Sequence, residues 1–126
     1  SKEKIKQKLK TYLEHNAIGM TKDQYLRMCE QTGEEIDWDR CPPEPEDFPE
    51  STLTGINIFN ELGDRVYPDV GYIGKDFTNL QLLFDLYGIK TKAEIDWQME
   101  LIFYLEEKTI KESQQKIKAA HDKIKR

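Results

Sequence analysis

Large apolar side chains recur at the three- and four-residue spacing of an amphipathic helix in five stretches of the chain, separated by Gly, Pro or Asn. The most apolar stretch runs from Phe77 to Tyr87, FTNLQLLFDLY. Asp76 is a suitable N-cap for this helix, because its carboxylate can accept from the free N–H groups of the first turn. Gly88 can adopt the left-handed conformation that ends a helix. We expect this helix to lie at the centre of the core.

The core should also take side chains from a preceding helix over residues 50–62, which Pro49 can begin and Gly63 ends. The buried face of that helix should hold Leu53, Ile56, Phe59 and Leu62. The buried face of the central helix should hold Phe77, Leu80, Leu83, Phe84 and Tyr87. Across the helices, the side chains expected to be buried and mutually close are Phe59, Leu80, Phe84 and Phe103.

Two helices are predicted before the core. Residues 2–15 form an amphipathic helix with lysines around a narrow apolar stripe, and Asn16 and Gly19 end it. Packing on the domain or on a partner suits this stripe better than lying on an anionic membrane. Thr21 and Gln24 then form a capping box that begins a helix running to about Thr32. The stripe holds Ile5, Leu9, Tyr12 and Leu13, and the second helix should bury Tyr25, Leu26, Met28 and Cys29.

Residues 34–49 are predicted to be an extended linker, since four of the five prolines lie there. Ile36, Trp38 and Phe48 should pin it to the core, although its acidic and aromatic composition also suits a binding peptide. Residues 63–75 set β-prone side chains among Gly and Pro, which predicts a structured loop or short hairpin rather than a sheet. Gly71 and Gly74 are expected to be structural turn residues there.

The last helix is predicted over about 92–124, after a capping box formed by Thr91 and Glu94. Its first half is rich in apolar residues. In its second half only Ile110, Ile117 and Ile124 recur, and the positions that would complete a coiled-coil seam are not apolar. We therefore expect this half to project into solvent, or to meet another chain through those isoleucines.

The pattern predicts an all-α protein: a single small domain of four to five helices with a Gly/Pro-rich loop and a long, partly projecting C-terminal helix. Residues 1–19 would be a basic N-terminal helix or extension, 20–105 an acidic helical domain, and 106–126 a basic helical extension. No apolar run is long enough to cross a membrane, and no signal-peptide core is present. A cytoplasmic protein is expected.

Charge is unevenly distributed over the 126 residues, although the formal net charge is only -5. Residues 1–15 carry five Lys and two Glu, and residues 106–126 carry seven Lys or Arg and four Asp or Glu, so each end is +3. Residues 21–105 carry the other seven basic and eighteen acidic residues, which gives -11. Nucleic acid is not an expected partner, because a protein binds it by neutralising its phosphates with positive charge and residues 21–105 are acidic. Two interpretations stay open. The charges keep the surface solvated, or the basic ends bind acidic surfaces, such as those of neighbouring copies of the chain.

Candidate chemistry is weak throughout. Cys29 and Cys41 are expected to be free thiols, and His15 and His121 lie far from them, so no zinc site or other metal site is predicted. The loop before the central helix lacks the glycine spacing and hydroxyl of a phosphate loop. The acidic clusters lack the order of a calcium loop. We expect no catalytic residue and no cofactor, because no acid, base, nucleophile or metal set converges.

One short motif points to a partner instead. Residues 81–84, Gln-Leu-Leu-Phe, are similar to the peptide with which bacterial replication proteins bind a sliding clamp. That peptide works from a flexible segment, whereas these side chains also serve a helix face. We interpret them as core residues.

Residues 49–107 follow a recognisable order: Pro-Glu, an apolar helix, a Gly-x-x-Gly-x-Asp-aromatic loop, a Leu-rich helix ending in Leu-x-Gly-Ile, and a final helix with a central Glu. The residues at these positions are Pro49, Glu50, Phe59, Gly71, Gly74, Asp76, Phe77, Leu80, Leu86, Gly88, Ile89 and Glu106. This order resembles a family of small tailed-bacteriophage proteins encoded among tail genes beside tail assembly chaperones. Where that family often carries a Trp pair before the loop, this chain has Asp64, Arg65 and Tyr67. Residues 20–35 are also similar to the opening of small phage proteins of unassigned function.

The resemblance implies a non-enzymatic phage assembly factor, tail assembly chaperone-like, in the cytoplasm of an infected bacterium. Its partners would be the tape measure or tail tube protein, and a homo-oligomer is a further expectation. The candidate partner-binding residues are Ile110, Ile117, Ile124, Ile5, Leu9 and Tyr12. Two alternatives stay open: a structural virion component of the neck, tail or capsid, and a regulator that binds a polymerase, clamp or defence protein.

Overall fold

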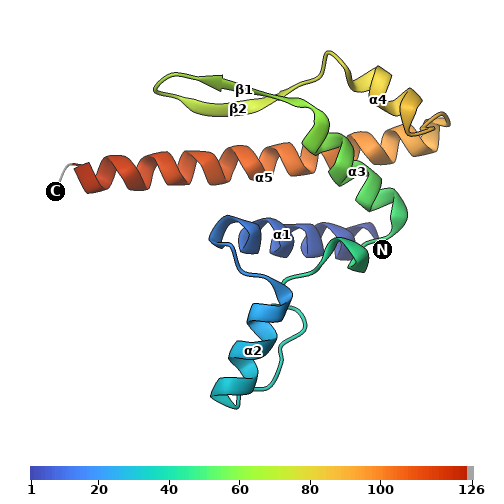
Figure 1. Ribbon diagram of the computed structural model, residues 1–126. Helices are drawn as coiled ribbons and strands as arrows, with labels where there is room; N and C mark the ends of the chain where they lie inside the picture. Colours follow the sequence, from blue (N-terminus) through green and yellow to red (C-terminus); the bar gives the residue numbers. More distant parts are fainter. Residues whose placement is uncertain (125–126) are drawn as a thin grey trace. The chain divides into compact units, whose positions relative to one another are not determined.

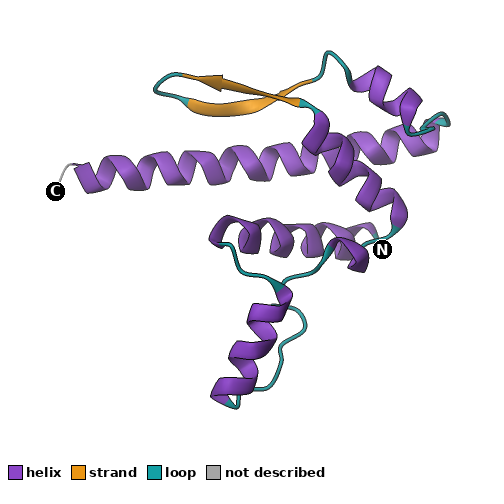
Figure 2. Ribbon diagram, in the orientation of Figure 1, coloured by secondary structure: helices purple, strands orange, loops and turns teal. Residues whose placement is uncertain are grey.

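The computed structural model describes residues 1–124 of the chain, and 67% of the structure is helical. The α-helices are α1 (Lys2–Ile18), α2 (Lys22–Thr32), α3 (Glu50–Glu61), α4 (Leu80–Leu86) and α5 (Lys92–Ile124), with a short 3-10 turn at Pro45–Asp47. Strands β1 (Gly63–Tyr67) and β2 (Gly71–Asp76) form an antiparallel hairpin (Figures 1 and 2). The prediction of a mostly helical protein is confirmed. The all-α class is wrong in one element, because residues 63–76 pair as strands.

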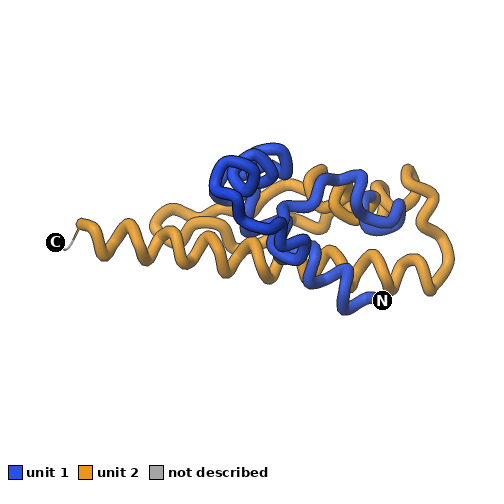
Figure 3. The backbone as a smooth tube through the Cα atoms, turned by 90° about the horizontal axis from the view of Figure 1, so that it is seen from below, with its two compact units in different colours: residues 1–53 blue, residues 54–126 orange. Residues whose placement is uncertain are grey.

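The chain forms two compact units, which Figure 3 colours separately. Unit 1 is Ser1–Leu53 and unit 2 is Thr54–Arg126. The division falls inside α3, whereas the sequence suggested divisions after residues 19 and 105. Each unit is described by itself below.

Local signals set the helix ends of unit 1. The Ser1 hydroxyl accepts from the backbone N–H of Lys4, and Gly19 ends α1 with φ 70°. Thr21 and Gln24 each bond the other's backbone N–H, so the predicted capping box is confirmed. Helix α2 ends at Gly33, with φ 74°. In both glycines the absent Cβ permits a left-handed conformation that other residues rarely adopt.

The segment after α2 packs differently from the prediction. Phe48 is buried and its ring meets that of Tyr12 edge-on, with centroids 5.7 Å apart. Ile36 and Trp38, however, keep 39% and 66% of their surface exposed, so the expectation that they pin the linker is wrong. The reason is a turn around Asp37, whose backbone N–H and carbonyl both bond the Tyr25 hydroxyl at 3.3 Å. This turn holds the backbone and leaves the two apolar side chains outside.

Cys41 of this segment is also buried, and on α2 the buried residue is Cys29. Both cysteines are free thiols, as predicted. Burial is the largest cause of the raised pKa of the Cys41 thiol, because an apolar setting disfavours the thiolate. Tyr25 and Leu26 are half-buried, and Met28 is 41% exposed, so only Cys29 of the four predicted residues lies fully inside.

Asp47 ties the Pro-rich segment to both helices of unit 1. Its carboxylate accepts from Lys22 Nζ at 2.8 Å and from the Glu44 backbone N–H at 2.9 Å. Its carbonyl accepts from Lys8 Nζ at 2.6 Å, and that ammonium also lies 5.5 Å from the Phe48 ring centre. The segment is therefore fixed by hydrogen bonds as well as by apolar contact.

We expect Asp47 to make unit 1 sensitive to acid. The Lys22 hydrogen bond, then that from Glu44, holds the pKa of the Asp47 carboxyl below its usual 3.8. The pKa of Asp47 is lower in the folded protein than in the unfolded chain. The stabilisation is therefore present above the usual pKa and is lost as the pH falls through the lowered pKa. Asp47→Asn should lower the melting temperature at pH 7, and its difference from the wild type should shrink as the pH falls below 3.8, the usual pKa of the carboxyl. Thermal unfolding by circular dichroism between pH 7 and pH 3 measures this. A difference that stays constant with pH would contradict the role of the carboxylate charge.

In unit 2 the end of α3 is followed by a hairpin, over residues that the sequence analysis left open between a loop and a short hairpin. Tyr67 and Val70 flank its turn, in which Asp69 has φ 66°. The register pairs Val66 with Tyr72, and a bulge falls between Arg65 and Val66. A two-stranded hairpin is marginal by itself, so support from another element is needed.

That support comes from α5, which packs along β2 (Figure 1). Two glycines make the close approach possible. A Cβ on Gly71 (φ 87°) would collide with Cδ1 of Ile117, and a Cβ on Gly74 (φ 132°) would lie 2.9 Å from Glu106 Oε2. That same oxygen accepts from the backbone N–H of Lys75 at 2.7 Å. Gly71 and Gly74 are therefore structural, as predicted, but for packing against α5 as well as for turning.

The most buried face of α5 comprises Gln98, Leu101, Ile102 and Leu105, all at most 1% exposed, with Ile58 of α3 equally buried. Phe59 and Phe84 are buried as predicted. Leu80 is only half-buried, and Phe103 is 50% exposed, so these two core predictions are wrong. Phe103 follows Ile102 around the helix by about 100° and so leaves the buried face, where it stacks edge-on with Phe77 at 5.8 Å.

Asp76 does not cap a helix, which corrects the sequence analysis. It is the last residue of β2, and its Oδ1 accepts from the backbone N–H and the hydroxyl of Thr78 at 2.9 and 2.6 Å. This local turn delays α4 until Leu80. At the other end, Gly88 has φ 72° and the N–H of Ile89 bonds the Phe84 carbonyl at 2.8 Å, which confirms the predicted left-handed cap.

Helix α5 begins and ends as predicted. The Thr91 and Glu94 side chains bond each other's backbone N–H, and the helix runs unbroken to Ile124. Its second half differs from the expectation, because the hairpin lies against it. Ile110 and Ile117 are half-buried next to Gly74 and Gly71, whereas Ile124 is 81% exposed.

Candidate protein-binding surface

The outer side of α4 exposes two large apolar side chains. Leu82 and Leu86 are four residues apart, which places them on one face of the helix, and they are 56% and 72% exposed. Phe84, between them in sequence, is 3% exposed and points to the core. We call Leu82 and Leu86 the α4 surface. It arises because the sequence LQLLFDL places apolar residues on both sides of one short helix.

A helix that is apolar on all sides is normally buried on all sides. In α4 the polar residues Gln81 and Asp85 bond one another at 3.1 Å and leave the leucines uncovered. The helix is nevertheless held at both ends, by the Asp76 turn and the Gly88 cap described above. The α4 surface is therefore a pair of exposed apolar side chains on a helix held at both ends, and it is our candidate for a protein-binding surface.

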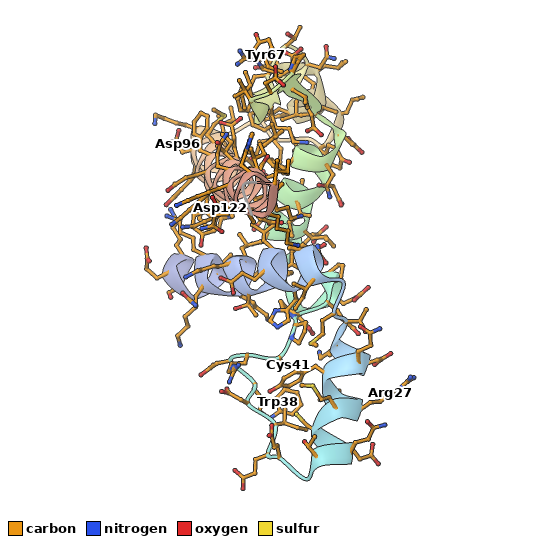
Figure 4. The ribbon with its side chains drawn as sticks, turned by 90° about the vertical axis from the view of Figure 1, so that its left-hand side faces the viewer. Arg27, Trp38, Cys41, Tyr67, Asp96 and Asp122 are labelled. Atoms are coloured by element: carbon orange, nitrogen blue, oxygen red, sulfur yellow. The ribbon has the colours of Figure 1, made fainter. Side chains whose placement is uncertain are left out.

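A second apolar group lies at the end of the hairpin. Val66, Tyr67 and Val70 are 62%, 53% and 48% exposed, and Figure 4 shows Tyr67 at the extremity of unit 2. Every residue of β1 is exposed, since β2 and not β1 takes the support of α5. Among the described residues no strand lies beside the outer edge of β1, so the backbone groups of this edge can pair with another strand.

The sequence-predicted partner residues fall into three situations. In unit 1, Leu9 is fully buried, and Ile5 and Tyr12 are half-buried. In unit 2, Ile110 and Ile117 already contact the hairpin of the same chain, and Ile124 is open. The sequence reasoning did not select the α4 surface. The sequence nevertheless contains a signal for this surface, because Leu82 and Leu86 lie outside the helix face that was assigned to the core.

A charged cluster lies inside unit 2 between the hairpin and the end of α3. The Lys75 ammonium is 7% exposed, lies 2.6 Å from Asp64 Oδ1, donates to the Leu62 carbonyl at 3.2 Å, and sits 4.4 Å from the Phe59 ring centre. Burial, and then the charge of Asp64, raises the pKa of the Tyr72 hydroxyl. The Lys75 contacts are all internal, so this cluster anchors the hairpin.

A cavity of about 420 Å³ opens beside this cluster and is lined by both α5 and the hairpin. The Tyr72 hydroxyl borders it and has no hydrogen-bond partner within residues 1–124. A polar cavity of this size can hold water that satisfies such a group.

Three other predictions can be compared with the structure. Over the described part of the chain, no group of three or more His, Cys, Asp or Glu side chains is placed to hold a metal. Likewise, none of the helices in residues 1–124 combines the length and apolar character that crossing a membrane requires. In the clamp-like motif Phe84 is buried and Leu83 half-buried, but Leu82 is 56% exposed, so the interpretation as core residues is confirmed for Phe84 and wrong for Leu82.

The chain was compared with protein-family models, with curated proteins and with solved structures, and none of the three comparisons gave a match.

Proposed function

We propose that the chain is a non-enzymatic phage assembly factor that binds other proteins, of the tail assembly chaperone-like kind that the resemblance over residues 49–107 implies. The observation that carries the binding role is the α4 surface, two leucines more than half exposed on a helix fixed at both ends. The phage context rests on the sequence resemblance alone.

The partner that fits this surface is an apolar segment with a basic rim. Asp85 lies on α4 itself, and residues 54–105 of the same unit carry four Lys or Arg and eight Asp or Glu, which gives -4. Burying two leucines favours binding by the apolar area removed from water, and the acidic surroundings steer positively charged partners toward it. Segments of the tape measure or tail tube protein, exposed before assembly, are the proposed occupants.

The test is co-purification of the tail tube or tape measure protein with this chain after co-expression. Leu82→Lys with Leu86→Lys should abolish capture and lower the soluble yield of the partner, because the α4 surface becomes charged. Gln81→Lys also adds positive charge to this helix, one unit instead of two, but outside the leucine pair, and it should leave capture intact. Capture that survives the double leucine variant would refute this surface as the binding site.

Mass spectrometry of purified virions then separates the alternatives. An assembly chaperone should be absent from the finished particle. Recovery of the chain in every particle at a fixed ratio to the tail subunits would instead identify a structural component. Capture of a host polymerase, clamp or defence protein, with no capture of tail proteins, would indicate the regulator.

A further inference from the structure

A second surface, in unit 1, has a different character from the α4 surface. A groove with a volume of about 640 Å³ lies between one face of α1 and the segment that follows α2. Lys4, Lys8 and Thr11 line its helical wall, and Trp38 and Cys41 line the other. Figure 4 shows Trp38 and Cys41 on that segment.

Trp38 is presented rigidly at this groove. The neighbouring Asp37 bonds Tyr25 through its backbone and accepts from the Asp39 N–H through its carboxylate at 3.1 Å. The N–H groups of Arg40 and Cys41 both bond the Asp37 carbonyl at 3.0 Å. A large indole that is 66% exposed on such a fixed turn has the properties of an interface anchor, because little conformational entropy is lost when it is buried.

The groove wall on α1 and the segment that carries Trp38 have opposite charges. The helical wall carries Lys4, whose ammonium has no ion-pair partner within residues 1–124, and Lys8, which bonds only a backbone carbonyl. The turn is preceded by Glu34 and Glu35, both exposed and likewise without an ion pair in the described part of the chain. One surface thus holds a cationic wall, an acidic segment and an apolar anchor.

We propose that this surface pairs with itself in a second copy of the chain. In a two-fold dimer each contact is made twice, so a patch must offer both members of every complementary pair. Residues 34–39 of one copy would enter the groove of the other, with Trp38 against the partner's groove wall and Glu34 and Glu35 against Lys4. The basic first helix and acidic middle of the chain make this the complementary occupant.

Sedimentation equilibrium of the full chain tests the proposal. We expect a monomer–dimer equilibrium that shifts toward monomer in 1 M salt, where the screening length falls to about 3 Å. Trp38→Ala should raise the dimer dissociation constant at least about tenfold, as for other buried tryptophan anchors. A chain that stays monomeric at 200 µM, or a dimer unaffected by Trp38→Ala, would overturn the proposal; that concentration is on the order of weak self-association.

Charge reversal gives the sharper experiment. Lys4→Glu alone, and Glu34→Lys with Glu35→Lys alone, should each weaken self-association, because like charges then face one another across both contacts. Mixing the two variants should restore dimers, since every reversed charge meets its opposite. Lys10→Glu makes the same charge change on α1 outside the groove lining and is the control. If Lys10→Glu weakens the dimer as much as Lys4→Glu, or if mixing restores nothing, the groove is not the contact.

Discussion

Replacing Phe84 by Ala should destabilise unit 2 by about 3–5 kcal/mol, the usual cost of emptying a buried phenylalanine site. Phe84 is 3% exposed, and its carbonyl also receives the N–H of Ile89 at the end of α4. The side chain therefore fills the core from a helix of only seven residues, which has little other packing to hold it. Urea denaturation followed by circular dichroism gives the free energy of unfolding.

Leu82→Ala is the matched control for that experiment. It removes a large apolar side chain from the same helix, but Leu82 is 56% exposed, so the expected loss is below about 0.5 kcal/mol. Equal losses from the two variants would mean that burial of the Phe84 side chain is not what stabilises unit 2, since Ala favours the helix at both positions.

The second large effect is expected at Gly71, where substitution by Ala should cost about 2–4 kcal/mol. One part of this cost is backbone strain, since φ is 87° and an L side chain is disfavoured there. The other part is overpacking, because the new Cβ would collide with Cδ1 of Ile117. The free energy of unfolding of Gly71→Ala against the wild type measures the sum.

A double-mutant cycle with Ile117→Ala separates the two parts. Shortening Ile117 removes the atom in collision, so Gly71→Ala should then cost only the strain, about 1 kcal/mol. Gly63→Ala is the control, because Gly63 has no positive φ and open space where its Cβ would be. If Gly71→Ala costs the same in both backgrounds, the hairpin does not rest on Ile117.

The features that sequence predicted well are those that depend on nearby residues. The Thr21–Gln24 and Thr91–Glu94 caps each involve a hydroxyl and a carboxyl or amide three residues apart, and both formed as expected. The Gly88 cap is also local, because its conformation follows from the missing Cβ. The bounds of α5 followed from an uninterrupted stretch without Gly or Pro.

The errors arose where distant residues decide between local possibilities. Ile102 and Phe103 are adjacent apolar residues of α5, and only the packing of the other elements determines which one is buried. Asp76 has the chemistry of a helix cap, but its carboxylate accepts instead from the backbone N–H and the hydroxyl of Thr78. Residues 63–76 became strands because α5 supplies the support that a lone hairpin lacks, through Glu106 and Ile117, which follow the glycines they pack against by more than thirty residues.

The candidate site was missed for a related reason. In the helical pattern of residues 77–87, only the face expected to be buried was assigned. Leu82 and Leu86, on the opposite face, are exposed. For two isoleucines of α5 the error was the opposite one, since residues expected to be exposed or to meet another chain are covered by the hairpin. Ile110 and Ile117 had no apolar partner at heptad spacing, and no sequence pattern shows that glycine backbone would approach them instead.

The distance along the chain between the hairpin and its support has a consequence for synthesis on the ribosome. Gly71 and Gly74 are translated well before Glu106 and Ile117, against which they pack. Until those later residues leave the exit tunnel, the nascent hairpin carries unsupported strand edges and the exposed Val66 and Tyr67. Domains tend to fold as their chain emerges, so residues 1–53 can become ordered first, while unit 2 must wait for most of α5. Slow translation between residues 76 and 117 would prolong the interval in which nascent chains can aggregate.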